Sequence, residues 1–303
     1  MRISILDQVP LTEHAPTEAE AVASGIRFAQ EAEELGYQRI WFAEHHRSRS
    51  FASPAPEMMT SLALERTTTT RVGTGRILLP LYPASKVAEV MGTLGQVHGD
   101  RVDTGRAALD DQRYGEKTAQ LVRERGSPHG PVAGKPLAGC GCSAQAARPR
   151  RWPASSARDM RTSTSSVPRG GEEATNAYRE AADEAGHAAH TMLAVRVITA
   201  QTEQRAQAQG DALLLWRACK DLGQDGPIPS AETTARHGWN DQERIRAKAR
   251  GKTISAATPD EVHAELTALA AAHGAEEIMV NTLTSDPADR LASHRLLAER
   301  FAA

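Results

Sequence analysis

Segments typical of strands and helices alternate along the first and last thirds of the chain, and this alternation restricts the possible folds more than any other feature. The predicted strands span residues 2–6, 39–43, about 72–79, 101–105, about 191–199, 252–256 and 276–282. Helix-like segments separate them, so the strands are expected to pair in parallel through right-handed crossovers. The pattern predicts an α/β fold, either an eight-fold (β/α) barrel or an open doubly wound sheet.

The ends of two helices carry recognisable capping residues. Thr17, followed three residues later by Glu20, is a capping box, and Gly36 is suited to end the helix that it opens. Thr258 and Pro259 provide an N-cap and a proline at the first helical position of a second helix. These local signals place helix boundaries on both sides of the predicted strands.

The middle of the chain does not follow the alternation. In residues 110–171 apolar residues are scarce and isolated, as in "AARPRRWPASSARDMRTSTSSVPRGG". No strand or helix period is present, and a structureless loop of that length is unusual inside a compact domain. We predict one barrel domain over residues 1–303, in which 110–171 is an irregular or disordered insertion or a degenerate segment that lacks barrel units.

Charge and cysteine content narrow the class of partner. The formal net charge of the 303 residues is −2, so no basic excess indicates a nucleic-acid or anionic-membrane partner. No segment is typical of a signal peptide or of a membrane span. The three cysteines have neither CxxC nor zinc-site spacing. We expect a cytoplasmic protein without a metal site, acting on a small molecule.

A polar triplet follows the second predicted strand. Glu44, His45 and His46 come directly after the apolar run of residues 39–43. In a parallel α/β fold functional groups gather at the carboxyl ends of strands, and histidine transfers protons near neutral pH. Two neighbouring strand residues point to opposite faces, which disfavours chelation of one metal ion by both imidazoles. The triplet is therefore a candidate site for proton transfer.

Glycines interrupt the third predicted strand. Gly73, Thr74 and Gly75 lie within "VGTGRILLPL". Glycine in a strand indicates either a close approach of the backbone to another group, such as a flat ligand, or a β-bulge at a barrel corner. The spacing alone favours neither interpretation. It is not the GxGxxG pattern of a dinucleotide site.

Three segments, in this order and spacing, resemble the bacterial luciferase-like flavin monooxygenases. They are "LGYQRIWFAEHH", "RVGTGRILLPLYPASKVAE" and "RVDTGRA", and the opening "MRISILDQVPL" is similar to a subgroup found in actinobacterial secondary metabolism. The resemblance implies a TIM barrel of the luciferase-like type. It further implies reduced FMN from a separate flavin reductase and O2 as co-substrate for the oxygenation of a small organic molecule, as in antibiotic biosynthesis.

The same resemblance assigns roles to individual residues. It implies that His45, with Glu44 beside it, is catalytic and assists proton transfer at the flavin. The positions that match the family's cofactor site are Thr74, Gly75, Arg76, Arg106 and Ser143. The first three would back the flavin ring, and Arg106 and Ser143 would hold its phosphate.

Two other functions stay open, because the sequence does not distinguish FMN from deazaflavin and because the chain departs from the family pattern before Ser143. The residues expected there to form the fifth strand read "KPLAGC", which is poor material for a buried strand, so the barrel is expected to be incomplete at that point. The alternatives are a deazaflavin-dependent oxidoreductase and a non-catalytic or degenerate barrel subunit. A homodimer, or pairing with a related subunit, is also expected.

Trp216 and the charged run 241–252 receive structural interpretations. Trp216 lies in an apolar stripe at helical spacing and is expected to pack in the core or at an interface. The run 241–252 is expected to form a solvated face.

Overall fold

The computed structural model describes residues 1–78, 81–106, 140–142, 160–162, 175–176, 179–180, 183–184 and 190–301. The side chains of Arg76 and Arg106 lie outside this description, as does the whole of Ser143. Most of the predicted irregular segment 110–171 also lies outside it. The predictions that concern these residues therefore stay predictions.

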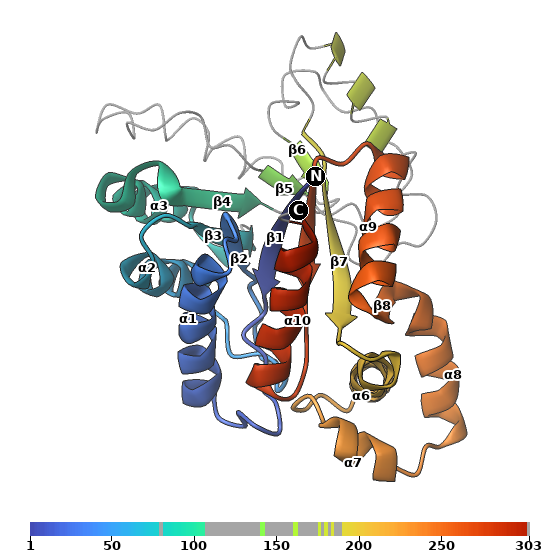
Figure 1. The fold of residues 1–303 in the computed structure, drawn as a ribbon. Coiled ribbons are helices and arrows are strands. Elements are labelled where there is room, and N and C mark those ends of the chain that lie inside the picture. Colours follow the sequence, from blue (N-terminus) through green and yellow to red (C-terminus); the bar gives the residue numbers. More distant parts are fainter. Residues whose placement is uncertain are drawn as a thin grey trace.

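A parallel sheet forms the centre of the molecule (Figure 1). Its strands are β1 (Arg2–Asp7), β2 (Arg39–Phe42), β3 (Arg71–Ile77), β4 (Val102–Arg106), β7 (Met192–Thr199), β8 (Ile254–Ala257) and β9 (Glu277–Asn281). Within the described residues these seven strands pair in the order β4-β3-β2-β1-β9-β7-β8. Each predicted strand of the first and last thirds is present. The last strand in the chain, β9, lies between β1 and β7.

A short parallel pair lies outside the seven-stranded sheet. Strands β5 (Cys140–Cys142) and β6 (Met160–Thr162) pair with each other. β5 lies beside β4 and β6 lies beside β7. The pair therefore contacts one edge of the sheet, β4, and the inner strand β7, whereas β8 forms the other edge. No ladder joins it to either neighbour in the part of the chain that the structure describes.

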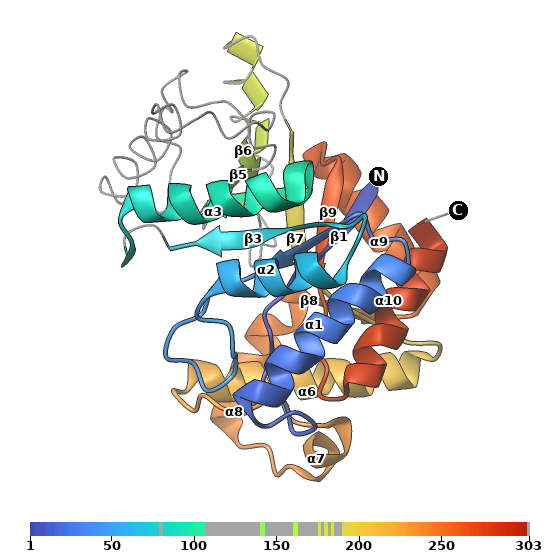
Figure 2. The ribbon, with the colours of Figure 1, turned by 90° about the vertical axis from the view of Figure 1, so that its left-hand side faces the viewer.

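Helices cover the sheet (Figures 1 and 2). They are α1 (Glu18–Glu34), α2 (Pro56–Arg66), α3 (Ala84–His98), α6 (Glu203–Asp221), α7 (Ala231–Arg236), α8 (Asp241–Arg250), α9 (Pro259–His273) and α10 (Pro287–Phe301). The capping boxes at Thr17 and Thr258 are both present, and Gly36 has the positive φ of 84° suited to a helix end. Among the described helices, none is both long enough and apolar enough to cross a membrane.

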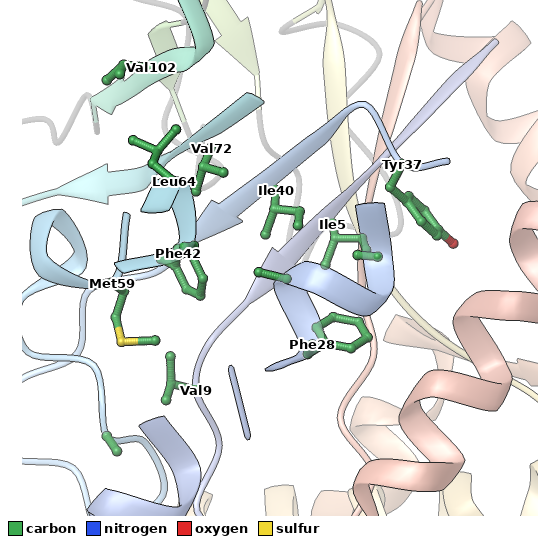
Figure 3. Close-up of a cluster of buried hydrophobic side chains, with 14 of the residues drawn as sticks. Ile5, Val9, Phe28, Tyr37, Ile40, Phe42, Met59, Leu64, Val72 and Val102 are labelled. Atoms are coloured by element: carbon green, nitrogen blue, oxygen red, sulfur yellow. The ribbon is translucent and has the colours of Figure 1, made fainter. Parts of the chain in front are cut away.

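Both faces of the sheet are buried, as parallel sheets require. On one face, Ile5, Ile40, Phe42 and Val72 belong to a core with Phe28 of α1 and with residues of α2 (Figure 3). The opposite face carries a separate apolar cluster, made of Leu6, Trp41, Met192, Ala194 and Met279. Register explains the division, because Leu6 lies opposite Trp41 and Ala194 opposite Met279 on neighbouring strands.

Candidate active site at the strand ends

The segment after β2 folds back along the segment after β1, and this arrangement brings the predicted histidine to the end of both strands. The backbone N–H of Ala43 donates to the carbonyl of Asp7 (2.9 Å), and the N–H of Ala52 donates to the carbonyl of Val9 (2.9 Å). Within the loop, the N–H of His45 donates to the carbonyl of Ser53 (2.9 Å). Backbone hydrogen bonds at both ends of segment 44–53 therefore fix the position of the loop that carries His45.

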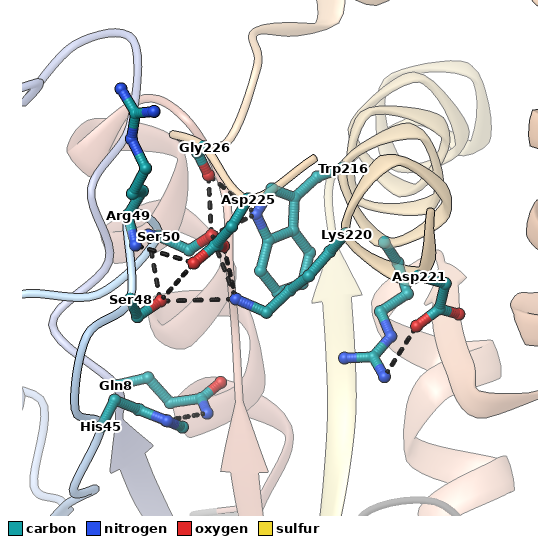
Figure 4. A network of polar contacts seen from close by, with 11 residues as sticks. Gln8, His45, Ser48, Arg49, Ser50, Trp216, Lys220, Asp221, Asp225 and Gly226 are labelled. Atoms are coloured by element: carbon teal, nitrogen blue, oxygen red, sulfur yellow. Dashed lines mark hydrogen bonds and ion pairs between the residues drawn. The ribbon is translucent and has the colours of Figure 1, made fainter. Parts of the chain in front are cut away.

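The imidazole of His45 is held at one edge and on one face. Its Nε2 lies 2.8 Å from the side-chain nitrogen of Gln8 (Figure 4). Its ring stacks on Phe51, with centroids 4.3 Å apart and planes 23° apart. The side chain is half-buried. A ring fixed in this way can exchange protons with a bound group without losing its position.

Glu44 is bonded on the side of β3, whereas His45 is held on the side of β1. The buried Glu44 carboxylate accepts hydrogen bonds from the N–H of Leu78 (2.7 Å) and the hydroxyl of Tyr82 (2.7 Å). It also lies 2.5 Å from Nε2 of His46. Burial and the hydrogen bond to Glu44 raise the pKa of the Tyr82 phenol. These contacts anchor the chain after β3 to the end of β2.

Phe51 is itself supported by the end of α6. Trp216 meets the Phe51 ring edge-on with centroids 5.7 Å apart, and the Lys220 ammonium lies 5.2 Å from the Phe51 ring centroid. Trp216 is buried, which confirms the packing role predicted for it. Its indole N–H also donates to the Ser50 hydroxyl (3.0 Å).

Asp225 joins the loop that carries His45 to α6 (Figure 4). Its carboxylate accepts from Lys220 Nζ (2.5 Å), from the N–H of Arg49 (2.7 Å) and from the hydroxyls of Ser48 and Ser50. Although partial burial opposes the shift, these donors, with Lys220 first, lower the pKa of Asp225 to about 2. No local sequence pattern predicts this network, because its members are separated by about 175 residues of chain.

The glycines of β3 allow close contact with neighbouring strands. A Cβ on Gly73 would lie 2.4 Å from the Asp103 carbonyl oxygen, and one on Gly75 would lie 2.9 Å from the Leu6 side chain. The pairing of β3 with β4 shifts register between Thr74 and Ile77. A register shift of this kind is what the bulge interpretation of the segment predicts, and the flavin contacts predicted for Thr74 and Gly75 stay predictions.

The residues predicted to hold a phosphate can be placed only in part. The backbone of Arg106 ends β4, and Cys142, which precedes Ser143, ends the adjacent strand β5. Cys142 thus lies in a strand that contacts the one that Arg106 ends, and the phosphate-binding roles of Arg106 and Ser143 stay predictions. Arg76 lies in the backbone of β3.

Several buried polar atoms near the strand ends have no partner in the described part of the chain. They are Gln8 Oε1, Trp41 Nε1, Thr74 Oγ1 and Thr104 Oγ1, contributed by β2, β3, β4 and the end of β1. Thr74 lies opposite Phe42, and Thr104 opposite Thr74, so both hydroxyls lie on the helix-covered face. Trp41 belongs to the apolar cluster of the opposite face, which also contains Leu6. A buried polar atom normally has a partner, so Trp41 Nε1 and Gln8 Oε1 beside this apolar cluster suit the polar edge of a bound flat ring.

Comparison with known proteins shows relatives along the whole chain. The family model described as luciferase-like monooxygenase matches residues 1–112. The uncharacterised protein YwcH of Bacillus subtilis is 31% identical over 339 aligned residues, covering 99% of both chains. A luciferase-like monooxygenase of Escherichia coli K12 is 37% identical over 112 residues, covering 36% of this chain and 33% of its own.

Solved structures have the same fold. The crystal structure of apo-MsnO8 matches with a TM-score of 0.80 and 27% identity, covering 99% of this chain and 98% of its own. Two structures share the fold at lower identity. One is the oxygenating constituent of a Pseudomonas putida 3,6-diketocamphane monooxygenase with FMN (16%, TM-score 0.70, covering 99% and 97%). The other is an F420-dependent secondary alcohol dehydrogenase with an F420-acetone adduct (13%, TM-score 0.68, covering 99% and 98%).

These matches confirm the predicted barrel fold of the luciferase-like type. The resemblance that the first third of the sequence suggested extends over the full length of YwcH. The chain belongs to the luciferase-like monooxygenase family.

Proposed function

We propose that this protein is a flavin-dependent monooxygenase that uses reduced FMN and O2 to oxygenate a small organic substrate, of the kind found in secondary metabolism such as antibiotic biosynthesis. The observation that carries the proposal is the fixed position of His45 beside unpartnered buried polar atoms at the ends of β1 and β2. Family membership and a fold neighbour with bound FMN support the choice of cofactor.

The protein's own residues would bind and orient the cofactor and handle protons. Gln8 Oε1, Thr74 and Gly75 would meet the ring, while Arg76, Arg106 and Ser143 are the predicted contacts to the rest of the cofactor. Reduced flavin, when bound, supplies the electrons and the reaction with O2. His45 would give and take the proton at Nε2 or Nδ1. Glu44 would act by anchoring the chain after β3, because its oxygens already accept three hydrogen bonds.

A separate flavin reductase would provide the reduced cofactor, and a second copy or a related subunit would complete the assembly. These partners follow from the resemblance of the sequence to the family. We expect the protein to be located in the cytoplasm. Gel filtration with light scattering and reconstitution with a general flavin reductase test the two partners directly.

Anaerobic titration of the purified protein with reduced FMN tests the proposed function. We expect saturable binding at micromolar concentrations, followed on aeration by a transient flavin absorbance that differs in a His45→Ala variant. A His263→Ala variant is the matched control, because His263 is also half-buried but lies on α9, where its ring contacts Phe301. Turnover should fall about 100-fold in the first variant and stay unchanged in the second.

The same titration with reduced deazaflavin separates the other candidates. Binding of deazaflavin alone would replace the proposal by a hydride-transferring oxidoreductase. Binding of neither cofactor would leave the non-catalytic barrel subunit as the function.

A further inference from the structure

We propose that Gln8 is a positioning residue that holds the His45 ring and keeps the proton of the neutral imidazole on Nδ1. The effect of Gln8 on turnover rests on the proposed function, whereas its effect on the protonation of the His45 imidazole does not. Gln8 carries no sequence signal for this role, since it lies 37 residues from its partner.

The contact between the two side chains determines which nitrogen is protonated. The amide nitrogen of Gln8 lies 2.8 Å from Nε2 of His45, so the amide donates and Nε2 accepts. With the amide turned over, its NH2 group would be a buried donor group without a partner in the described part of the chain, which is rarer in proteins than the unpartnered carbonyl oxygen of the observed orientation. An accepting Nε2 in a neutral imidazole requires the proton on Nδ1.

A carboxamide can also serve the charged form of the ring. When His45 takes up a proton, Nε2 becomes a donor, and a half-turn of the Gln8 amide presents Oε1 to it. A methionine of similar size offers neither interaction, and a glutamate only accepts. Glutamine is therefore suited to a histidine that changes its protonation state while keeping its place.

The backbone around Gln8 is held in an unusual conformation. Val9 has a φ of 51°, which a β-branched residue rarely adopts. The Val9 N–H donates to Asp7 Oδ1 (2.8 Å), and the Asp7 carboxylate is paired with the buried Arg290 guanidinium (3.1 Å). Strained residues that the surrounding contacts hold in place concentrate at functional sites. Here the strained residue, Val9, directly follows Gln8 in the segment that contacts His45.

The loop that carries His45 is constrained from the other side. Arg47 has the same positive φ of 51°, and Phe51 covers one face of the ring. Two charged groups near this contact are engaged elsewhere. Lys220, which lies over Phe51, is bonded to Asp225, and Glu44 is bonded on the side of β3. Among the described side chains, Gln8 is a neutral partner at the Nε2 edge of the ring.

The test follows the His45 imidazole by proton–nitrogen correlation spectroscopy across pH in the full-length, cofactor-free protein with labelled histidine. A His45→Ala variant assigns the signal among the 11 histidines. We expect Nδ1–H in the neutral wild type and imidazole nitrogen shifts displaced from the wild-type values in Gln8→Met, because methionine removes the donor to Nε2. In Gln8→Glu we expect Nε2–H and a titration midpoint raised by about 1 pH unit.

Gln209→Met is the matched control, because Gln209 is likewise buried with an unpartnered Oε1 but lies on α6. It should leave the His45 signals unchanged. Unaltered His45 shifts in both Gln8 variants, or Nε2–H in the neutral wild type, would overturn the proposal. If turnover is present, Gln8→Met should lower kcat about tenfold with little change in KM. Altered shifts in a protein without turnover would retain the role of Gln8 and refute the proposed function alone.

Discussion

At the scale of single residues, glycine permits an unusually close approach of β3 to β4. A Cβ on Gly105 would lie 2.3 Å from the Thr74 carbonyl oxygen, and one on Gly73 would meet the Asp103 backbone at a similar distance. Both obstacles are backbone atoms, which cannot turn aside as a side chain can. The glycines in "VGTG" and "VDTG" therefore have a packing role between two strands.

Replacement of Gly105 by alanine should destabilise the protein by about 1–3 kcal/mol, because the strands must separate to admit the methyl group. The free energy of unfolding in urea measures the effect. Gly238→Ala is the control, since a Cβ there meets nothing within 4 Å. Equal free energies of unfolding for the two variants would show that β3 and β4 can separate without loss of stability.

At the scale of secondary-structure elements, one carboxylate joins the end of α1 to the start of β3. Glu33 accepts hydrogen bonds from the backbone N–H groups of Thr68 (2.9 Å), Thr69 (2.7 Å) and Thr70 (2.8 Å). Although desolvation opposes the shift, these donors lower the pKa of Glu33 from 4.5 to about 2. The carboxylate satisfies three donors that precede the strand.

Because the folded-state pKa of Glu33 is depressed, its contribution to stability is present above about pH 4.5 and is lost as the pH falls toward 2. Glu33→Gln should lower the free energy of unfolding at neutral pH by on the order of 1 kcal/mol and weaken its dependence on pH in that window. Glu34→Gln, at an exposed neighbour, is the control. If the free energy of unfolding of Glu33→Gln falls with acid as steeply as that of the wild type, Glu33 does not stabilise the protein in this way.

The element scale also shows where sequence patterns are reliable. The helix run expected to be a solvated face, 241–252, forms α8 (Asp241–Arg250) and is mostly exposed, yet Glu243 is buried. Glu243 completes a capping box with Asn240 and lies 2.9 Å from His237 Nε2. Caps and helix periods act between near neighbours in the chain, and so they can be predicted.

At the scale of the whole molecule, an ion network joins four strands at the amino ends of the sheet. Asp103 of β4 bonds Arg39 of β2 (2.7 Å) and Arg71 of β3 (2.5 Å), and Arg39 also bonds Glu277 of β9 (2.7 Å). Asp103 has no exposed side-chain surface. The network lies at the opposite end of the strands from His45, so it contributes to stability without touching the site.

Asp103→Asn should lower the free energy of unfolding by about 3 kcal/mol, because it leaves two partly buried guanidinium groups without their shared counter-charge. Chemical denaturation measures the loss. Asp260→Asn is the control, since Asp260 is 77% exposed and its pair with Arg300 should be worth less than about 1 kcal/mol. A similar loss in both variants would show that burial adds nothing to the network.

Much of the barrel could be predicted, but only part of the site. The strands, the caps and the position of His45 at a strand end follow from periodicity and punctuation within short windows. Gln8, Phe51 and Asp225 could not be singled out, because each acts through a partner brought close by the fold. The roles of Arg106 and Ser143, the single domain over 1–303 and the cytoplasmic location stay predictions.

The sequence by itself predicted the strands and helices of the first and last thirds, where two of the helices begin, and that a histidine follows the second strand. Only the tertiary structure decided that β9 lies between β1 and β7, that Glu44 faces β3, and that Gln8 holds His45. The physical reason is the range of the forces involved. Helix and strand periods arise from contacts between near neighbours, whereas strand order and side-chain pairing depend on contacts between segments that are distant in the chain.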